Sequence, residues 1–281
     1  MRLPLPSIPS MAMSFPGGIM FEGQSNRRLS TLQCCACYDL DLKMAQTSIR
    51  ENLLQVRERI FVAAQRAGRR AEEITLIGVS KTHPAEAIRE AYAAGLRHFG
   101  ENRVQEWEGK ESGTRDLNAT WHLIGHLQSN KAARAAKLFH AIDSVDDFAL
   151  AQRLDRARSE AGAAAKLRVL IEVHIAKEKA KSGVVVEELP ALAEKIVELP
   201  RLELAGLMCI PPFVENSDEA RPYFRRLREL RDGLTKQIGC VLPVLSMGMS
   251  HDFEMAIEEG ATEVRVGTAL FGTRSTIKVG Q

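Results

Sequence analysis

Residues 74–100 read ITLIGVSKTHPAEAIREAYAAGLRHFG and contain one complete strand–helix–strand unit. The opening run, 74–80, is short, continuously apolar and rich in β-branched residues, which predicts a parallel strand buried on both faces. Pro84 favours the first turn of a helix that runs to Ala94, and Gly95 is the kind of residue that ends one. The next apolar stretch follows at once, so the chain alternates strand, helix and strand.

The same unit repeats toward the end of the chain. Eight strands are predicted, at 74–80, His98–Gly100, Trp121–Gly125, His140–Ile142, Leu167–Ile175, Leu202–Ile210, Val244–Met247 and Glu263–Val266. Helices are expected before and between them, at 48–67, 84–94, 103–110, 129–138, 146–163, 187–198, 217–237 and 252–259. Eight strands alternating with helices predict a single (β/α)8 barrel of the TIM type. An open doubly wound sheet is the alternative, but it should show a glycine-rich turn where SKTHP stands.

Residues 1–43 differ in composition from 44–281, the segment predicted to form the barrel. The first segment is interrupted by prolines and glycines and has no helical or strand period. This pattern predicts a disordered N-terminal extension, or a start codon assigned too far upstream, because the chain from Met44 reads well as a true beginning. The acid-poor opening also weakly resembles an organelle transit peptide.

The composition excludes several classes of protein. Lys and Arg number 38 against 36 Asp and Glu, and aromatic residues make up 5%, so neither charge nor base stacking indicates nucleic-acid binding. No run of 18 apolar residues exists, so no transmembrane helix is expected. The five cysteines follow neither a disulfide framework nor a zinc-ligand spacing. They predict reduced thiols in a cytoplasmic protein without a metal site.

Candidate functional residues follow the first three strands, because a TIM-type barrel places its site at the carboxyl ends of its strands. Lys81 comes directly after the first strand. Partial desolvation there would make it a Schiff-base nucleophile, and a surface lysine before a helix is the alternative. Asn102 offers donors and an acceptor to a ligand ring, or caps the next helix. His126 is a ligand contact or a loop histidine.

Two loops near the end of the chain predict a phosphate site. They follow the seventh and eighth strands, where barrel phosphate sites recur and backbone N–H groups face an anion. Glycine lets the backbone approach the anion, and hydroxyl groups add donors. The residues with this capacity are Ser246, Gly248, Ser250, Gly267 and Thr268.

Arg265 lies inside the eighth strand, between Val264 and Val266. If the two valines face the helices, the arginine faces the barrel interior. A charge in that position is costly unless it is paired. The sequence therefore predicts a polar ring or an anion near the centre of the barrel.

Six segments stand in order at the strand ends: GVSKTHP (78–84), HFGENRVQE (98–106), WHLIGHLQSNK (121–131), KSG (181–183), GLMCIPP (206–212) and LSMGMSHDFEMAIEEGATEVRVGTALFG (245–272). Together they resemble the pyridoxal phosphate homeostasis protein family, whose barrel is similar to the N-terminal domain of alanine racemase. The resemblance runs from about Leu76 to Gly272. It departs from the family pattern at Leu123, where Phe is usual, and at His174, where Asn is frequent.

The resemblance implies that pyridoxal 5'-phosphate (PLP) is the cofactor and that Lys81 forms a Schiff base with its aldehyde. It also implies that Asn102 and Met208 lie near the pyridine ring and that Arg265 points at the ring nitrogen. The implied phosphate contacts are Ser246, Gly267 and Thr268.

PLP is an effective electron sink when its ring nitrogen is protonated, which an aspartate partner favours. An arginine there is a fixed cation and cannot accept a hydrogen bond from that proton, so it disfavours aminotransferase chemistry. Alanine racemases add a second base, a tyrosine from another domain. The three tyrosines here, Tyr38, Tyr92 and Tyr223, do not follow strands. The sequence therefore predicts a monomeric, non-catalytic carrier and buffer of PLP, with PLP-dependent apoenzymes as partners. A racemase-like PLP enzyme is the second candidate, and a barrel whose Lys81 attacks its substrate directly is the third.

Overall fold

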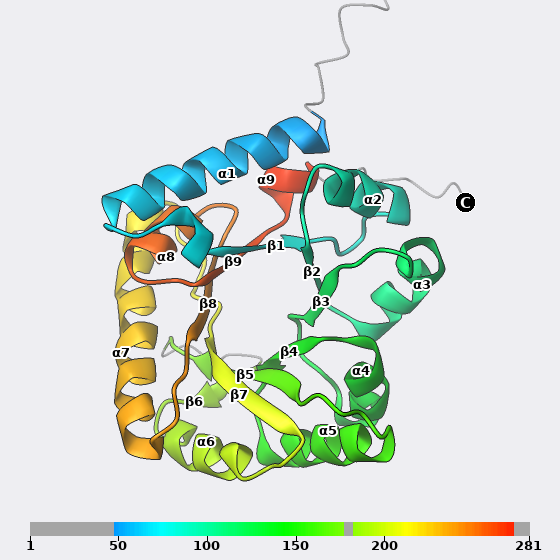
Figure 1. Cartoon of the computed structure of the whole chain (residues 1–281). Coiled ribbons are helices and arrows are strands. Elements are labelled where there is room, and N and C mark those ends of the chain that lie inside the picture. The colour runs from blue at the N-terminus through cyan, green and yellow to red at the C-terminus, as the bar shows by residue number, and fades with distance from the viewer. Residues whose placement is uncertain (1–47, 177–181, 273–281) are drawn as a thin grey trace, which may run out of the picture. The chain divides into compact units, whose positions relative to one another are not determined.

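Eight parallel strands close into a ring in the computed structural model, which describes residues 48–176 and 182–272 (Figure 1). The barrel strands are β1 Thr75–Val79, β2 His98–Glu101, β3 Thr120–Leu123, β4 Ala141–Val145, β5 Leu167–His174, β7 Leu202–Met208, β8 Val244–Met249 and β9 Glu263–Val266. Each strand pairs with the next, and β9 pairs with β1, so the sheet has no open edge. The predicted barrel is confirmed, and the open sheet is excluded.

Helices surround this ring (Figure 1). They are α1 Ile49–Arg66, α2 Ala85–Ala93, α3 Val104–Thr114, α4 Ala132–Leu138, α5 Phe148–Glu160, α6 Leu189–Val197, α7 Arg221–Ile238, α8 Phe253–Glu258 and α9 Thr268–Phe271, with 3-10 turns η1 Ala71–Glu73, η2 Ser129–Lys131 and η3 Ser217–Ala220. The helix α3 continues beyond its predicted end at 110 to Thr114, and an added Cβ on its Gly113 would lie 2.7 Å from Ala85 Cβ of α2. A short strand β6, Val184–Val185, pairs with β5 outside the ring and was not predicted.

The main apolar core lies between the ring of strands and the helices, and the barrel interior holds both apolar and charged side chains. On β9, Val264 and Val266 belong to the apolar shell, whereas Arg265 between them is buried on the other face. A small separate apolar cluster contains Leu170, Ala205 and Met208. Alternation along each strand therefore places charged groups inside the ring, which is where a polar ligand can be held.

Some predictions lie outside the described residues: the extension at 1–43, the cysteines and the tyrosine within it, and Lys181 of the KSG segment. The two described cysteines, Cys209 and Cys240, are free thiols. Within the described ranges, every helix is too short or too polar to cross a membrane.

Candidate functional site

Lys81 lies at the barrel mouth, in the turn that follows β1 and Ser80. Its side chain is half-buried, and its ammonium group makes no hydrogen bond or ion pair with any described residue. On the neighbouring strand β9, Arg265 pairs in register with Ile77 of β1. Beyond the end of β9, a Cβ on Gly267 would lie 3.5 Å from Val79. The lysine and the loop after β9 therefore stand side by side.

Arg265 is 3% exposed and reaches across the interior toward β7 and β8. Its Nη2 donates to the carbonyl oxygen of Cys209, and its Nη1 donates to Ser246 Oγ, both at 2.8 Å. Ser246 is fully buried within β8, inside the predicted strand Val244–Met247, and therefore does not lie in the loop that was predicted to bind phosphate. The Ser246 hydroxyl thus positions the guanidinium, and its contact with phosphate stays a prediction.

Ser250 joins the two loops that the sequence analysis assigned to phosphate. Its Oγ accepts hydrogen bonds from the N–H groups of Gly267, at 3.2 Å, and Ala269, at 3.3 Å. Thr268 between them is exposed. Ser250 is among the loop residues that the sequence indicated as able to bind phosphate, but the contacts implied by the family resemblance were Ser246, Gly267 and Thr268.

Asn102 is held at the mouth by close contact with the end of β3. A Cβ on Gly125 would lie 2.5 Å from the Asn102 carbonyl oxygen, so only glycine allows this approach. Met208 ends β7 and is fully buried. His126 is exposed, and its Nδ1 lies 3.4 Å from Asp146 Oδ2, so the histidine that the sequence left open has an acidic partner.

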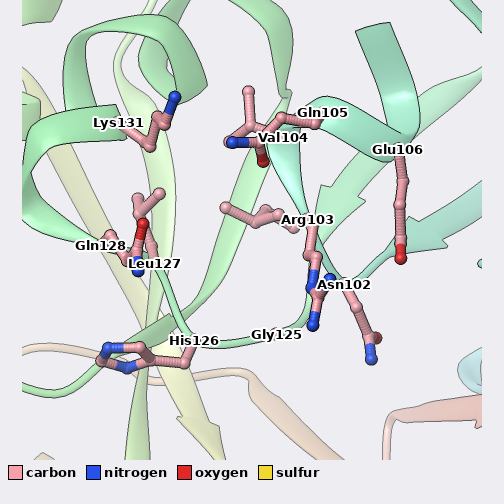
Figure 2. Close-up of a pocket in the computed structure, with 11 residues that line it drawn as sticks. Asn102, Arg103, Val104, Gln105, Glu106, Gly125, His126, Leu127, Gln128 and Lys131 are labelled. Atoms are coloured by element: carbon pink, nitrogen blue, oxygen red, sulfur yellow. The ribbon is translucent and has the colours of Figure 1, made fainter. Parts of the chain in front are cut away.

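A cavity of about 720 Å³ opens beside Asn102, between the residues that follow β2 and β3 (Figure 2). Arg103, His126 and Lys131 contribute positive or titratable groups to its lining. Of the residues assigned to the cofactor, only Asn102 lines it. The cavity therefore adjoins the predicted cofactor site without coinciding with it.

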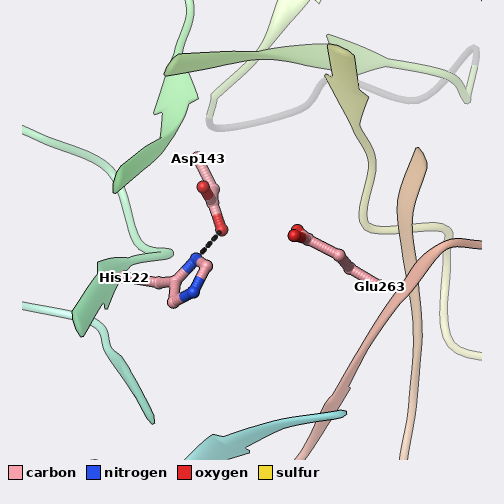
Figure 3. Close-up of side chains that lie close together, drawn as sticks. All are labelled: His122, Asp143 and Glu263. Carbon is pink, nitrogen blue, oxygen red and sulfur yellow. Dashed lines mark hydrogen bonds and ion pairs between the residues drawn. The ribbon is translucent and has the colours of Figure 1, made fainter. Parts of the chain in front are cut away.

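A layer of charged side chains lies inside the barrel nearer the amino ends of the strands. His122, Asp143 and Glu263 are buried with ligand atoms within 4.8 Å of one another (Figure 3). His122 Nδ1 lies 3.2 Å from Asp143 Oδ2, and the Arg168 guanidinium donates to Glu263 at 2.6 Å. These donors suit a divalent metal, but Arg168 already supplies positive charge to Glu263. We therefore interpret the layer as a charge-paired network.

The two carboxyl groups of this network titrate in opposite directions. Burial raises the pKa of Glu263, and the nearby Asp143 carboxylate adds to that effect. Burial also opposes ionisation of Asp143, but His122 and Arg168 outweigh it and hold the Asp143 pKa below its usual value. Asp143 is accordingly the group that carries the negative charge beside His122.

His98 should make the protein sensitive to mild acid. Its Nδ1 lies 3.1 Å from His122 Nε2, and burial together with the His122 charge lowers the pKa of His98 to about 4. The unfolded chain takes up this proton below about pH 6.5, so the free energy of unfolding should fall as pH drops from about 6.5 toward 4. Between pH 7 and pH 5, the free energy of unfolding of His98→Asn, measured by urea unfolding, should fall less than that of wild type. An identical pH dependence of the two proteins would contradict this assignment.

Barrel and site together define a protein of the alanine racemase N-terminal domain class, and the family model "Alanine racemase, N-terminal domain" matches residues 51–275. The pyridoxal phosphate homeostasis protein of Aquifex aeolicus is 49% identical over 224 residues, which are 80% of this chain and 97% of that relative. The chain belongs to the pyridoxal phosphate homeostasis protein family.

Solved structures agree with this assignment. PipY of Synechococcus elongatus PCC7942, solved with PLP bound, is similar with a TM-score of 0.71 and 42% identity, over 80% of this chain and all of PipY. Alanine racemase of Clostridium difficile 630 matches with a TM-score of 0.63 at 15% identity, over 83% of this chain and 62% of the racemase. This more distant likeness shows a shared fold.

Proposed function

We propose that this protein binds PLP as a Schiff base on Lys81 and serves as a non-catalytic carrier and buffer of that cofactor in vitamin B6 homeostasis. The observation that carries the proposal is the placement of Lys81 beside the loop after β9. Arg265, on β9 itself, is buried below that loop. The names of the relatives, homeostasis proteins rather than enzymes, support it. Its partners would be PLP-dependent apoenzymes, and the protein would act as a monomer.

The residues at the mouth fit the parts of PLP. PLP supplies an aldehyde that condenses with a primary amine, and Lys81 offers an amine without a competing partner among the described residues. Arg265 is fixed by Ser246 and by the Cys209 carbonyl. Its guanidinium would donate a hydrogen bond to the ring nitrogen and, as a fixed cation, would disfavour protonation of that nitrogen. A ring nitrogen kept unprotonated weakens PLP as an electron sink, which suits storage better than turnover.

Thr268→Val should weaken PLP binding about tenfold. The exposed Thr268 hydroxyl is a donor to the phosphate, and one charge-assisted hydrogen bond contributes roughly 1.5–3 kcal/mol. Valine keeps nearly the same volume, so the change should leave the barrel intact. The dissociation constants of wild type and variant are compared by titration with PLP and with pyridoxal, which lacks the phosphate. Pyridoxal should bind wild type far more weakly, and equal affinities for the two compounds would refute the phosphate assignment.

The decisive experiment maps the modified lysine. Purified protein is incubated with PLP, reduced with borohydride, digested and analysed by mass spectrometry, while a parallel sample is assayed for amino-acid racemisation and for transfer of PLP to an apoenzyme. Label on Lys81, transfer and no racemisation support the carrier. Racemisation that depends on Lys81 would support the racemase-like enzyme instead, and label on another lysine would overturn the site.

A further inference from the structure

A buried ion pair holds the turn that carries Lys81. The carbonyl oxygen of Ser80 accepts hydrogen bonds from the His83 N–H at 3.1 Å and from Lys110 Nζ at 2.7 Å. Glu101 Oε1 accepts from Ser80 Oγ at 2.6 Å and from Lys110 Nζ at 2.8 Å. Glu101 is fully buried, and the Lys110 side chain is 11% exposed. These contacts fasten the end of β1 to the end of β2 and to α3.

The contacts lie on the helix side of the barrel wall. On β1, Leu76 packs on the apolar shell, whereas Ile77 and Val79 are buried apart from it, so alternate residues face inward and outward. Ser80 continues the strand pairing through its N–H bond to the Gly100 carbonyl, and its hydroxyl reaches outward to Glu101. Fixing Ser80 outward directs the next side chain, Lys81, toward the mouth.

The turn from Ser80 to His83 has a strained backbone. Thr82 has a φ of +66° and is the one non-glycine residue with positive φ in the described part of the chain. Its place after Lys81 is the third position of a type II turn, which normally needs glycine or asparagine. A β-branched residue holds this conformation only when its surroundings impose it. The second donor on the Ser80 carbonyl supplies such a constraint.

The far end of the turn is also fastened. The His83 ring stacks on Phe271 of α9, with ring centroids 5.0 Å apart. The turn is thus held at Ser80 by α3 and β2 and at His83 by the helix that follows the β9 loop. Lys81 itself, between these two anchors, is left without a partner among the described residues.

We propose that Lys110 and Glu101 are positioning residues that hold the Ser80–His83 turn in its strained conformation and so present Lys81 to the cofactor aldehyde. This inference rests on the proposed function of Lys81. Lys110 is not the nucleophile, because its ammonium is bound to Glu101 and to the Ser80 carbonyl. Its effect passes through the backbone of the turn.

Lys110→Met tests the proposal, because it removes the donors and keeps an unbranched side chain of similar length. Two quantities are measured: the rate of Schiff-base formation from PLP absorbance, and the affinity for pyridoxine 5'-phosphate, which has the ring and phosphate but no aldehyde. We expect the rate to fall at least tenfold and the affinity to change less than twofold. Lys110→Arg should recover most of the rate, and Lys137→Met, an exposed lysine on α4, should match wild type.

Adding Thr82→Gly distinguishes a lost turn conformation from a general loss of structure, because only the former should be reversed by it. Glycine adopts positive φ without strain, so the double variant Lys110→Met/Thr82→Gly should regain at least half of the wild-type rate. If Lys110→Met does not fold, Glu101→Gln takes its place, with the same expected split between rate and affinity and the same recovery. An unchanged rate, a parallel loss of rate and affinity, or no recovery by Thr82→Gly would overturn the proposal.

The position of the label in wild-type protein distinguishes a failure of the positioning role from a failure of the proposed function. Label on Lys81 together with an unchanged rate in Lys110→Met would overturn the positioning role alone. Label on another lysine would overturn both the proposed function and the positioning role that rests on it.

Discussion

Lys81→Ala should abolish the visible absorbance band of the PLP-loaded protein and leave its melting temperature nearly unchanged. The Lys81 side chain is half-buried, and its ammonium bonds to no described residue, so truncation breaks no contact of the fold. It removes the amine without which no Schiff base can form. Lys81→Arg should fail in the same way, because a guanidinium stays protonated and does not attack an aldehyde.

The measurement is the intact mass of each protein after incubation with PLP and reduction with borohydride. Wild type should gain one phosphopyridoxyl group, and both Lys81 variants should gain none. Lys137→Ala, which changes an exposed lysine on α4, is the matched control and should be labelled like wild type. A labelled Lys81→Ala protein would mean that another lysine is the nucleophile.

The strands could be predicted because buried parallel strands are continuous apolar runs. Where a strand ends at a different residue than predicted, the difference has a physical reason. The strand predicted at His140–Ile142 ends where the sequence turns polar, but β4 continues through Asp143 and Ser144 to Val145. Polar residues normally end a buried strand. Here the barrel interior holds charged side chains as well as apolar ones, and the Asp143 carboxylate pairs with His122 inside it. Single-strand patterns carry no information about such a partner on the next strand.

Candidate site residues could be named from the sequence where chain position singles them out, but not where a contact depends on long-range pairing. Lys81 and Arg265 stand out because a charged residue at or within an apolar strand needs a reason. Lys110 does not stand out, because a lysine on a helix normally faces solvent. Only the closed ring, which brings α3 against the end of β1, shows that its ammonium binds Glu101 and the Ser80 carbonyl.

Gly206→Ala should prevent the barrel from folding or leave it severely destabilised. A Cβ on Gly206 would lie 1.9 Å from the carbonyl oxygen of Val244 and 2.7 Å from its carbonyl carbon. Gly206 and Val244 are partners in the pairing of β7 with β8, so the obstacle is backbone that cannot rotate away. An overpacked side chain typically costs about 1–3 kcal/mol, and parting two central strands should cost more, against a total stability of about 5–15 kcal/mol.

Gly233→Ala is the matched control for this substitution. Gly233 lies in the helix α7, and a Cβ there would meet no atom within 4 Å, so alanine should keep or raise stability by up to about 1 kcal/mol. Soluble yield and urea unfolding compare the two variants, and a Gly206→Ala protein within about 1 kcal/mol of wild type would contradict the argument.

The same strand pair sets Met208 opposite Ser246, and Arg265 bonds to Ser246 and to the Cys209 carbonyl. Any Gly206→Ala protein that does fold should therefore bind PLP more weakly, because parting β7 from β8 moves both anchors of the Arg265 guanidinium.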